Sequence, residues 1–231
     1  MNGLLQAQGV PTGVWDWDFA GELVPQLAEG LWVTVQATIL GIIAAMILGL
    51  VLALARRSRQ KLISWPAAGL IEFVRSTPLL AQLFFLFFVL PDLGIVLSPM
   101  VTGVLALGIH YGAYTSESYR AGIESVPRGQ WEAAVALNMR PATKWRWVVL
   151  PQAVPTVIPA LGNYLVAMFK EAPLLSTITV VELLAVARSI QSRTFRGLEP
   201  FTLAGLLFLA VSIPAAMFVR YLERRYRYAR A

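Results

Sequence analysis

The chain has 231 residues, of which 57% are hydrophobic and only 14% are charged. A soluble domain carries roughly a quarter charged residues, so this chain has too few to coat a globule of its size. Zero cysteines and a single histidine argue against a disulfide framework, a metal site and a thiol nucleophile. Composition therefore excludes a soluble enzyme, a secreted scaffold and a nucleic-acid binder, and it favours an integral membrane protein.

Apolar runs recur along the chain, and each reaches the roughly 20 residues needed to cross about 30 Å of hydrocarbon. Residues 31–55, 148–169 and 201–219 are uncharged. Residues 62–90 carry two charges and two prolines, which predicts one kinked helix or an interfacial piece followed by a span. Residues 93–116 supply another span, expected to start near the proline at position 99, because proline favours a first helical turn. The pattern predicts an all-α membrane protein with five transmembrane helices in a single domain.

Basic residues gather on one face of the membrane if there are five spans. Most of the 19 lie in three segments, which are residues 56–61, a loop at about 120–147 and a tail at 220–231. Residues 1–28 hold none and are predicted as an external N-terminal segment. By the positive-inside rule the N-terminus is outside and the C-terminus is in the cytoplasm. The exception is the segment 170–200, expected outside, which carries Arg188, Arg193 and Arg196.

The positions of small residues and prolines predict how the helices pack. Small residues spaced four apart from Gly41 to Gly49, and again at Gly108 and Gly112, predict close helix contacts within this chain or with a partner. Prolines at 151, 155 and 159 each remove an amide donor from the fourth span. They predict either a helix that is irregular at its inner end and buried or beside a cavity, or a merely curved packed helix.

Several polar side chains fall at membrane depth, where each costs free energy unless it is paired or wet. His110, Tyr114 and Glu117 share one face of the third span. Such residues either line a translocation path or hydrogen-bond between helices to fix the bundle, and the set as a whole favours a path. The candidate path residues are Gln82, His110, Tyr111, Tyr114, Glu117, Asn163, Lys170 and Glu171.

The cytoplasmic loop carries a short predicted helix over residues 130–139, rich in alanine and holding one carboxylate, Glu132. A proline at 141 ends this helix or forces a turn. Small side chains allow such a helix to enter a groove of another protein, where a single acid can pair with an arginine. Composition alone leaves this docking role open beside that of an ordinary amphipathic interface helix.

The same loop resembles the EAA loop of permease subunits in ATP-binding-cassette importers. It has Glu-Ala-Ala at residues 132–134 and Leu-Pro at 150–151, with the spacing of that family. Asn138 stands where the family has glycine, and asparagine tolerates a left-handed backbone better than most residues. Three further stretches resemble the branch that transports polar amino acids, namely residues 73–85, 112–127 and 151–163. Residues 170–176 depart from that branch and resemble the permeases for ectoine and hydroxyectoine.

The resemblance implies the MetI-like permease fold, with five helices and a cytoplasmic coupling helix, in the bacterial cytoplasmic (inner) membrane. It implies three partners: a cytoplasmic ATPase dimer, a second permease subunit and an extracytoplasmic solute-binding protein. The residues expected to couple to the ATPase are Arg128, Gly129, Glu132, Ala133, Ala134 and Asn138.

The expected function is ATP-driven import of a small zwitterion, with no cofactor in this chain and no enzymatic activity. Two other functions compete with it, namely secondary transport and catalysis within the membrane. ATP is bound by the partner, because no Gly-Lys dipeptide and hence no P-loop occurs here. A secondary transporter is the alternative, but no inverted repeat is detectable. A membrane enzyme is disfavoured because no nucleophile or metal constellation is present.

Overall fold

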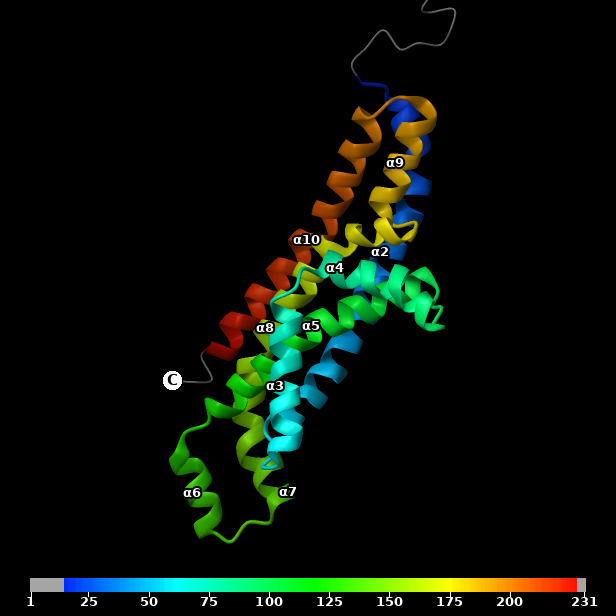
Figure 1. Ribbon diagram of the computed structural model, residues 1–231. Coiled ribbons are helices and arrows are strands. Elements are labelled where there is room, and N and C mark those ends of the chain that lie inside the picture. Colours follow the sequence, from blue (N-terminus) through cyan, green and yellow to red (C-terminus); the bar gives the residue numbers. More distant parts are fainter. Residues whose placement is uncertain (1–14, 228–231) are drawn as a thin grey trace, which may run out of the picture.

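The computed structural model describes residues 15–227, which fold almost entirely into helices (Figure 1). Residues 1–14 of the predicted external segment and residues 228–231 of the predicted basic tail lie outside the described residues. In chain order the elements are α2 (Trp17–Arg56), α3 (Lys61–Arg75), α4 (Leu79–Phe84), the π-helix η1 (Phe85–Val89), the 3-10 helix η2 (Leu90–Leu93), α5 (Pro99–Glu124), α6 (Arg128–Ala136), α7 (Pro141–Lys144), the π-helix η3 (Trp145–Val149), α8 (Leu150–Glu171), the 3-10 helix η4 (Ala172–Ile178), α9 (Leu183–Thr194) and α10 (Leu198–Arg227).

Within residues 15–227, three helical stretches are long and apolar enough to cross a membrane: Trp17–Arg56, Pro141–Ile178 and Leu198–Tyr226. The pair Lys61–Arg75 and Leu79–Leu93, bent by 106°, makes a fourth if it is one broken span, which agrees with the kink expected there. The remaining predicted span forms as α5 and begins at Pro99 as predicted, capped by the Ser98 hydroxyl. Its 26 residues are long enough, but small and polar side chains make it less apolar than the other three.

α5 lies against α2 through the small residues identified in the sequence. A Cβ added to Gly49 would lie 2.8 Å from the Thr115 Cβ and 2.9 Å from the Gly112 carbonyl oxygen. A Cβ added to Gly108 would lie 2.7 Å from the Ala44 Cβ. Such contacts bring two backbones close enough for dispersion forces to hold them in lipid, where no hydrophobic effect acts between helices. The predicted small-residue contacts are therefore formed within this chain.

The end of the bundle that carries α9 is more helical than predicted. α2 begins at Trp17 rather than near residue 31, because a helix that packs on protein need not be apolar all round. Its early turns bury Leu23 and Leu27 against α9 and α10. Residues 170–200, expected as a loop, form the end of α8, η4 and α9. Figure 1 shows α9 beside the first turns of α2 and α10.

The opposite end of the bundle carries the predicted cytoplasmic loop (Figure 1). The expected helix over 130–139 is α6, which ends at Ala136 because Asn138 adopts a left-handed backbone with φ of 50°. The π-helix η3 comes directly before Pro151, which confirms that this span is irregular at that end.

The three basic segments predicted to share one side of the membrane lie toward the end of the bundle that carries α6. The guanidinium group of Arg57, after α2, lies 5.8 Å from the ring centroid of Trp145 in the loop. The Ser125 hydroxyl, at the end of α5, lies 3.4 Å from that of Thr156 on α8, and α10 runs down beside α8. The basic residues after α2, those of the loop and those ending α10 therefore lie toward one end of the molecule (Figure 1).

Candidate functional site

Four aromatic side chains meet where α5 packs on α8, and we call them the aromatic cluster: His110, Tyr111, Tyr114 and Tyr164. The His110 ring centroid lies 5.4 Å from that of Tyr111 and 5.3 Å from that of Tyr114. The three tyrosine rings lie 6.1 to 6.3 Å from one another. These tilted and edge-on contacts leave ring faces that attract a cation.

Polar groups border the aromatic cluster. The Tyr111 hydroxyl donates to Glu171 Oε2 at 2.9 Å, and the hydroxyls of Tyr164 and Ser118 lie 3.0 Å apart. His110 and Tyr111 are only 9% and 5% exposed. Among the described residues, His110 Nδ1 is buried without a hydrogen-bond partner. An orphaned polar atom inside a protein costs free energy, so it marks a position where a ligand or water can bind.

A break in the helical backbone adjoins the aromatic cluster. The Arg75 guanidinium, at the end of α3, lies 5.3 Å from the Tyr114 ring centroid, and the Tyr114 hydroxyl lies 3.5 Å from the Arg75 carbonyl oxygen. Gln82 Nε2 donates to the Val74 carbonyl and to Thr77 Oγ1, both at 2.8 Å, and so holds the bend between α3 and α4. Broken helices at membrane depth are tolerated where they face a cavity or a path.

Glu117, another predicted path residue, is already paired. Its carboxylate accepts hydrogen bonds from Arg56 at the end of α2 and from Arg120 Nη2 at 2.8 Å. These ion pairs tie α2 to α5 at the end that carries the loop. A place for Glu117 in the path stays a prediction. Among the described residues, no group of three or more His, Asp or Glu side chains could hold a metal ion.

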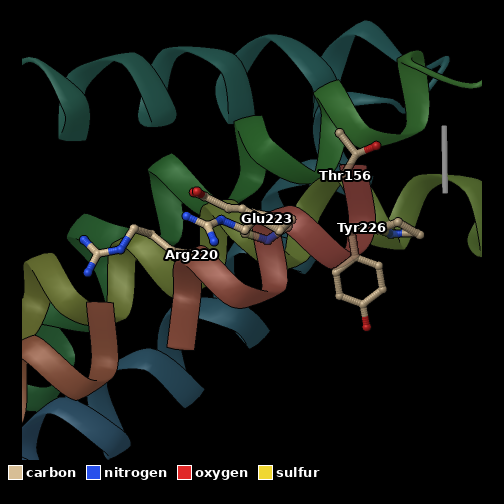
Figure 2. Close-up of a pocket in the computed structure, with 7 residues that line it drawn as sticks. Thr156, Arg220, Glu223 and Tyr226 are labelled. Carbon is tan, nitrogen blue, oxygen red and sulfur yellow. The ribbon is translucent and has the colours of Figure 1, made fainter. Parts of the chain in front are cut away.

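Asn163 and Lys170 lie on an exposed side of α8. Asn163 Nδ2 donates to Glu223 Oε1 on α10 at 3.0 Å. Glu223 also lines a hollow between α8 and α10, which has Thr156 on one side, Arg220 on the other and Glu223 between them (Figure 2). The predicted path residues therefore divide between the aromatic cluster with its borders and this second polar face.

The predicted coupling residues lie on and after α6. Glu132, Ala133, Arg128 and Gly129 are exposed there, whereas Ala134 is only 2% exposed. The Trp131 ring meets the Trp145 ring edge-on at 5.6 Å and so fixes α6 on its own loop. The left-handed Asn138 takes the conformation that the usual glycine would adopt. The loop thus presents one carboxylate on a short, supported helix.

Arg196, at the α9 end of the bundle, is neutralised locally. Arg196 pairs with Asp16 at 3.2 Å and with Glu199, which accounts for one of the three arginines that departed from the charge pattern. Arg188 and Arg193 bond instead to the Ser176 hydroxyl and the Ser189 carbonyl. The Phe19 amide, and then Arg196, hold the pKa of Asp16 below its usual value. The fully buried Glu182 caps α9 by accepting from the amides of Leu184 and Ala185, and burial raises its pKa. This end is fixed to the bundle by charge and capping.

Tyr164, Ser118 and Arg75 are site residues that the sequence reasoning missed. Tyr164 and Glu171 are seven apart on α8, a spacing that puts them on one helical face. Because Glu171 was a predicted path residue, this spacing could have identified Tyr164 from the sequence. Nothing in the sequence pairs Arg75 with Tyr114, because the bend that joins them depends on the tertiary arrangement.

A helical bundle with a polar, aromatic cluster beside a broken helix is typical of a membrane transport protein. Residues 37–228 match the family described as "Binding-protein-dependent transport system inner membrane component". The probable amino-acid ABC transporter permease protein y4tG of Sinorhizobium fredii (strain NBRC 101917 / NGR234) is 49% identical, with 92% of each chain covered. The L-cystine transport system permease protein TcyB of Bacillus subtilis (strain 168) is 36% identical, with 90% of each chain covered.

Solved structures show the same fold. A chain from the crystal structure of an amino acid ABC transporter with histidines superposes with a TM-score of 0.85 and 35% identity, covering 92% of this chain and 100% of that one. A chain from the inward-facing MetNI methionine ABC transporter superposes with a TM-score of 0.68 at 16% identity, covering 87% of this chain and 98% of that one. At that identity the likeness concerns the fold alone, and it confirms the MetI-like permease fold.

The chain belongs to the family of inner membrane components of binding-protein-dependent transport systems. It is the permease subunit of an ABC importer and is not itself catalytic, as predicted. The family decides against the secondary transporter and confirms a multi-pass protein of the inner membrane. A binding-protein-dependent ABC system also implies the predicted ATPase and solute-binding partners.

Proposed function

We propose that this permease carries a zwitterionic amino acid, or a compact zwitterion such as ectoine, past the aromatic cluster. The observation that supports this proposal is the meeting of three tyrosines and a histidine with Glu171 inside the bundle. A desolvated ammonium group is attracted both to ring faces and to a carboxylate. Relatives described as amino-acid and L-cystine permeases support an amino acid as the solute.

The two charges of the solute would meet different sides of the aromatic cluster. Glu171 and the faces of Tyr114 and Tyr164 suit the ammonium group. Arg75, which lies over the Tyr114 ring, suits the carboxylate. His110 Nδ1 and Gln82 Oε1 are buried without partners among the described residues and can hydrogen-bond the solute. Binding would open the Tyr111–Glu171 contact, which closes the cluster in this structure.

The exposed polar side of α8 supports a second permease subunit as a partner. Asn163 and Lys170 are exposed on the single subunit at the depth of a span. Such groups face a partner or a wet path rather than lipid. We therefore place a second copy or a paralogue across α8 and α10.

The exposed Glu132 and Ala133 on α6 support docking to the ATPase. α6 would then face the cytoplasm and the α9 end the outside, as the distribution of basic residues favours.

Reconstitution tests the transported solute. The permease, purified with its ATPase and binding protein, would be placed in proteoliposomes and assayed for ATP-driven uptake of L-cystine, L-glutamine, L-arginine, ectoine and hydroxyectoine. We expect uptake of at least one of the net-neutral zwitterions, which are L-cystine, L-glutamine, ectoine and hydroxyectoine, whereas L-arginine is a net cation. Uptake of an ectoine without the amino acids would support the closer resemblance at residues 170–176. Absence of ATP-dependent uptake for the whole panel would contradict the proposal.

Variants of the aromatic cluster test the path. Tyr164→Ala and Tyr114→Ala are expected to raise the half-saturation for uptake about 5- to 30-fold, because each removes a ring face worth about 1–2 kcal/mol to a cation. Trp32→Ala, at an exposed position of α2, is the matched control and should leave uptake unchanged. Wild-type half-saturation in both cluster variants would show that the path lies elsewhere.

A further inference from the structure

The hollow between α8 and α10 is separate from the aromatic cluster and carries charges of both signs. It has a volume of about 470 Å³, within the roughly 300–1,000 Å³ typical of small-molecule sites. Its lining comes from two helices: Pro155, Thr156 and Pro159 from α8, and Arg220, Glu223, Arg224 and Tyr226 from α10. Figure 2 shows Arg220 and Thr156 on opposite sides with Glu223 between them.

The hollow lies toward the end of the molecule that carries α6. The Thr156 hydroxyl is 3.4 Å from that of Ser125, which is the C-cap residue of α5 and stands three residues before α6. Asn163 on α8 donates to Glu223 of the lining at 3.0 Å. Asn163 directly precedes Tyr164, so the two side chains lie on adjoining faces of α8, one toward α10 and the other toward α5. α8 therefore borders both the hollow and the aromatic cluster, and Thr156 places the hollow nearer the coupling loop.

The lining groups match the two charges of a zwitterion. Arg220 and Arg224 provide guanidinium donors for a carboxylate. Glu223 provides an acceptor for an ammonium group. Pro159 has no amide hydrogen, so the carbonyl of Pro155 lacks its helical partner and is a further acceptor. An anionic phospholipid headgroup would use the arginines but would be repelled by the Glu223 carboxylate.

We propose that this hollow is a second binding station, at the cytoplasmic end of the path, for the zwitterionic solute that the permease carries. This inference rests on the proposed function, since the ligand is the transported solute. The solute leaves the aromatic cluster past Asn163 and pairs its carboxylate with Arg220 and its ammonium group with Glu223 before release. The arginines that end α10 thus bind solute as well as orienting the chain in the membrane.

Protection of an introduced cysteine tests this station directly. The chain has no cysteine, so Thr156→Cys creates its single thiol. In the detergent-solubilised complex with its ATPase and binding protein, labelling of this thiol by a methanethiosulfonate reagent would be timed with and without solute. The solute is whichever member of the uptake panel the wild-type complex imports. Arg225→Cys, on an exposed position that does not line the hollow, is the matched control.

We expect solute to slow labelling of Thr156→Cys at least threefold and to leave Arg225→Cys unaffected. Adding Arg220→Gln or Glu223→Gln to Thr156→Cys should abolish this protection, which a general conformational change would not do. Equal labelling with and without solute, protection that survives both substitutions, or protection by anionic phospholipid alone would overturn the inference. Such results with normal wild-type uptake would leave the proposed function standing, whereas absent uptake would refute that function itself.

Discussion

Glu117 lies near the end of α5, where guanidinium groups from two helices meet its carboxylate. Arg56 reaches it from α2, and Arg120 Nη2 approaches to 2.8 Å. The three side chains are 19% to 34% exposed, so the pairs are neither fully solvated nor fully buried. Exposed pairs contribute about 0.2–1 kcal/mol each, and hydrogen bonds to charged groups about 1.5–3 kcal/mol. Glu117→Gln should therefore lower the free energy of unfolding by about 1–2 kcal/mol.

The assay compares stability with transport. For a chain of this size such a loss corresponds to a fall of about 2–8 °C in the unfolding midpoint, measured by tryptophan fluorescence in detergent. The half-saturation for solute uptake should stay unchanged. Glu124→Gln is the control, because Glu124 is 55% exposed and within residues 15–227 forms a single ion pair, with Arg120, so its midpoint should move by less than half as much. An unchanged midpoint with a tenfold change in half-saturation would refute the reasoning and place Glu117 in the path.

Three further predictions concern other parts of the chain. Glu132→Lys should uncouple ATP hydrolysis from uptake while the protein still inserts into the membrane, so uptake at the wild-type rate would contradict the coupling role. Gly49→Ala should lower the unfolding midpoint, because the new Cβ would overlap α5, whereas Gly69→Ala, with nothing within 4 Å, should raise it through helix propensity. The lowered pKa of Asp16 means that its stabilising charge is fully present above about pH 4 and is lost as the pH falls through that pKa. The midpoints of wild type and Asp16→Asn should therefore converge in acid, and a constant difference from pH 7 to pH 3 would count against the effect.

Local chemistry made much of this protein readable from its sequence. Lipid demands helices with apolar surfaces, so the long uncharged runs predicted the spans, and the small-residue stripe from Gly41 to Gly49 predicted a close helix contact, within this chain or with a partner. The structure shows that α2 makes this contact with α5. The resemblance of residues 132–151 to the EAA loop of ABC permeases implied the permease fold, and Asn138, where that family has glycine, has a left-handed backbone. These features depend on neighbours along the chain, which a sequence displays directly.

The tertiary structure decided which polar residues meet. Tyr111, Tyr114 and Glu171 were predicted as candidate path residues, but their union with Tyr164 depends on how α5 and α8 are turned toward each other. Helical periodicity gives the face on which a side chain lies and not the helix that covers it. Hydropathy likewise underestimated the length of α2, because its charged early turns are stabilised by packing on α9 rather than by lipid. Contacts between distant segments arise from the packing of the whole bundle, so no local pattern specifies them.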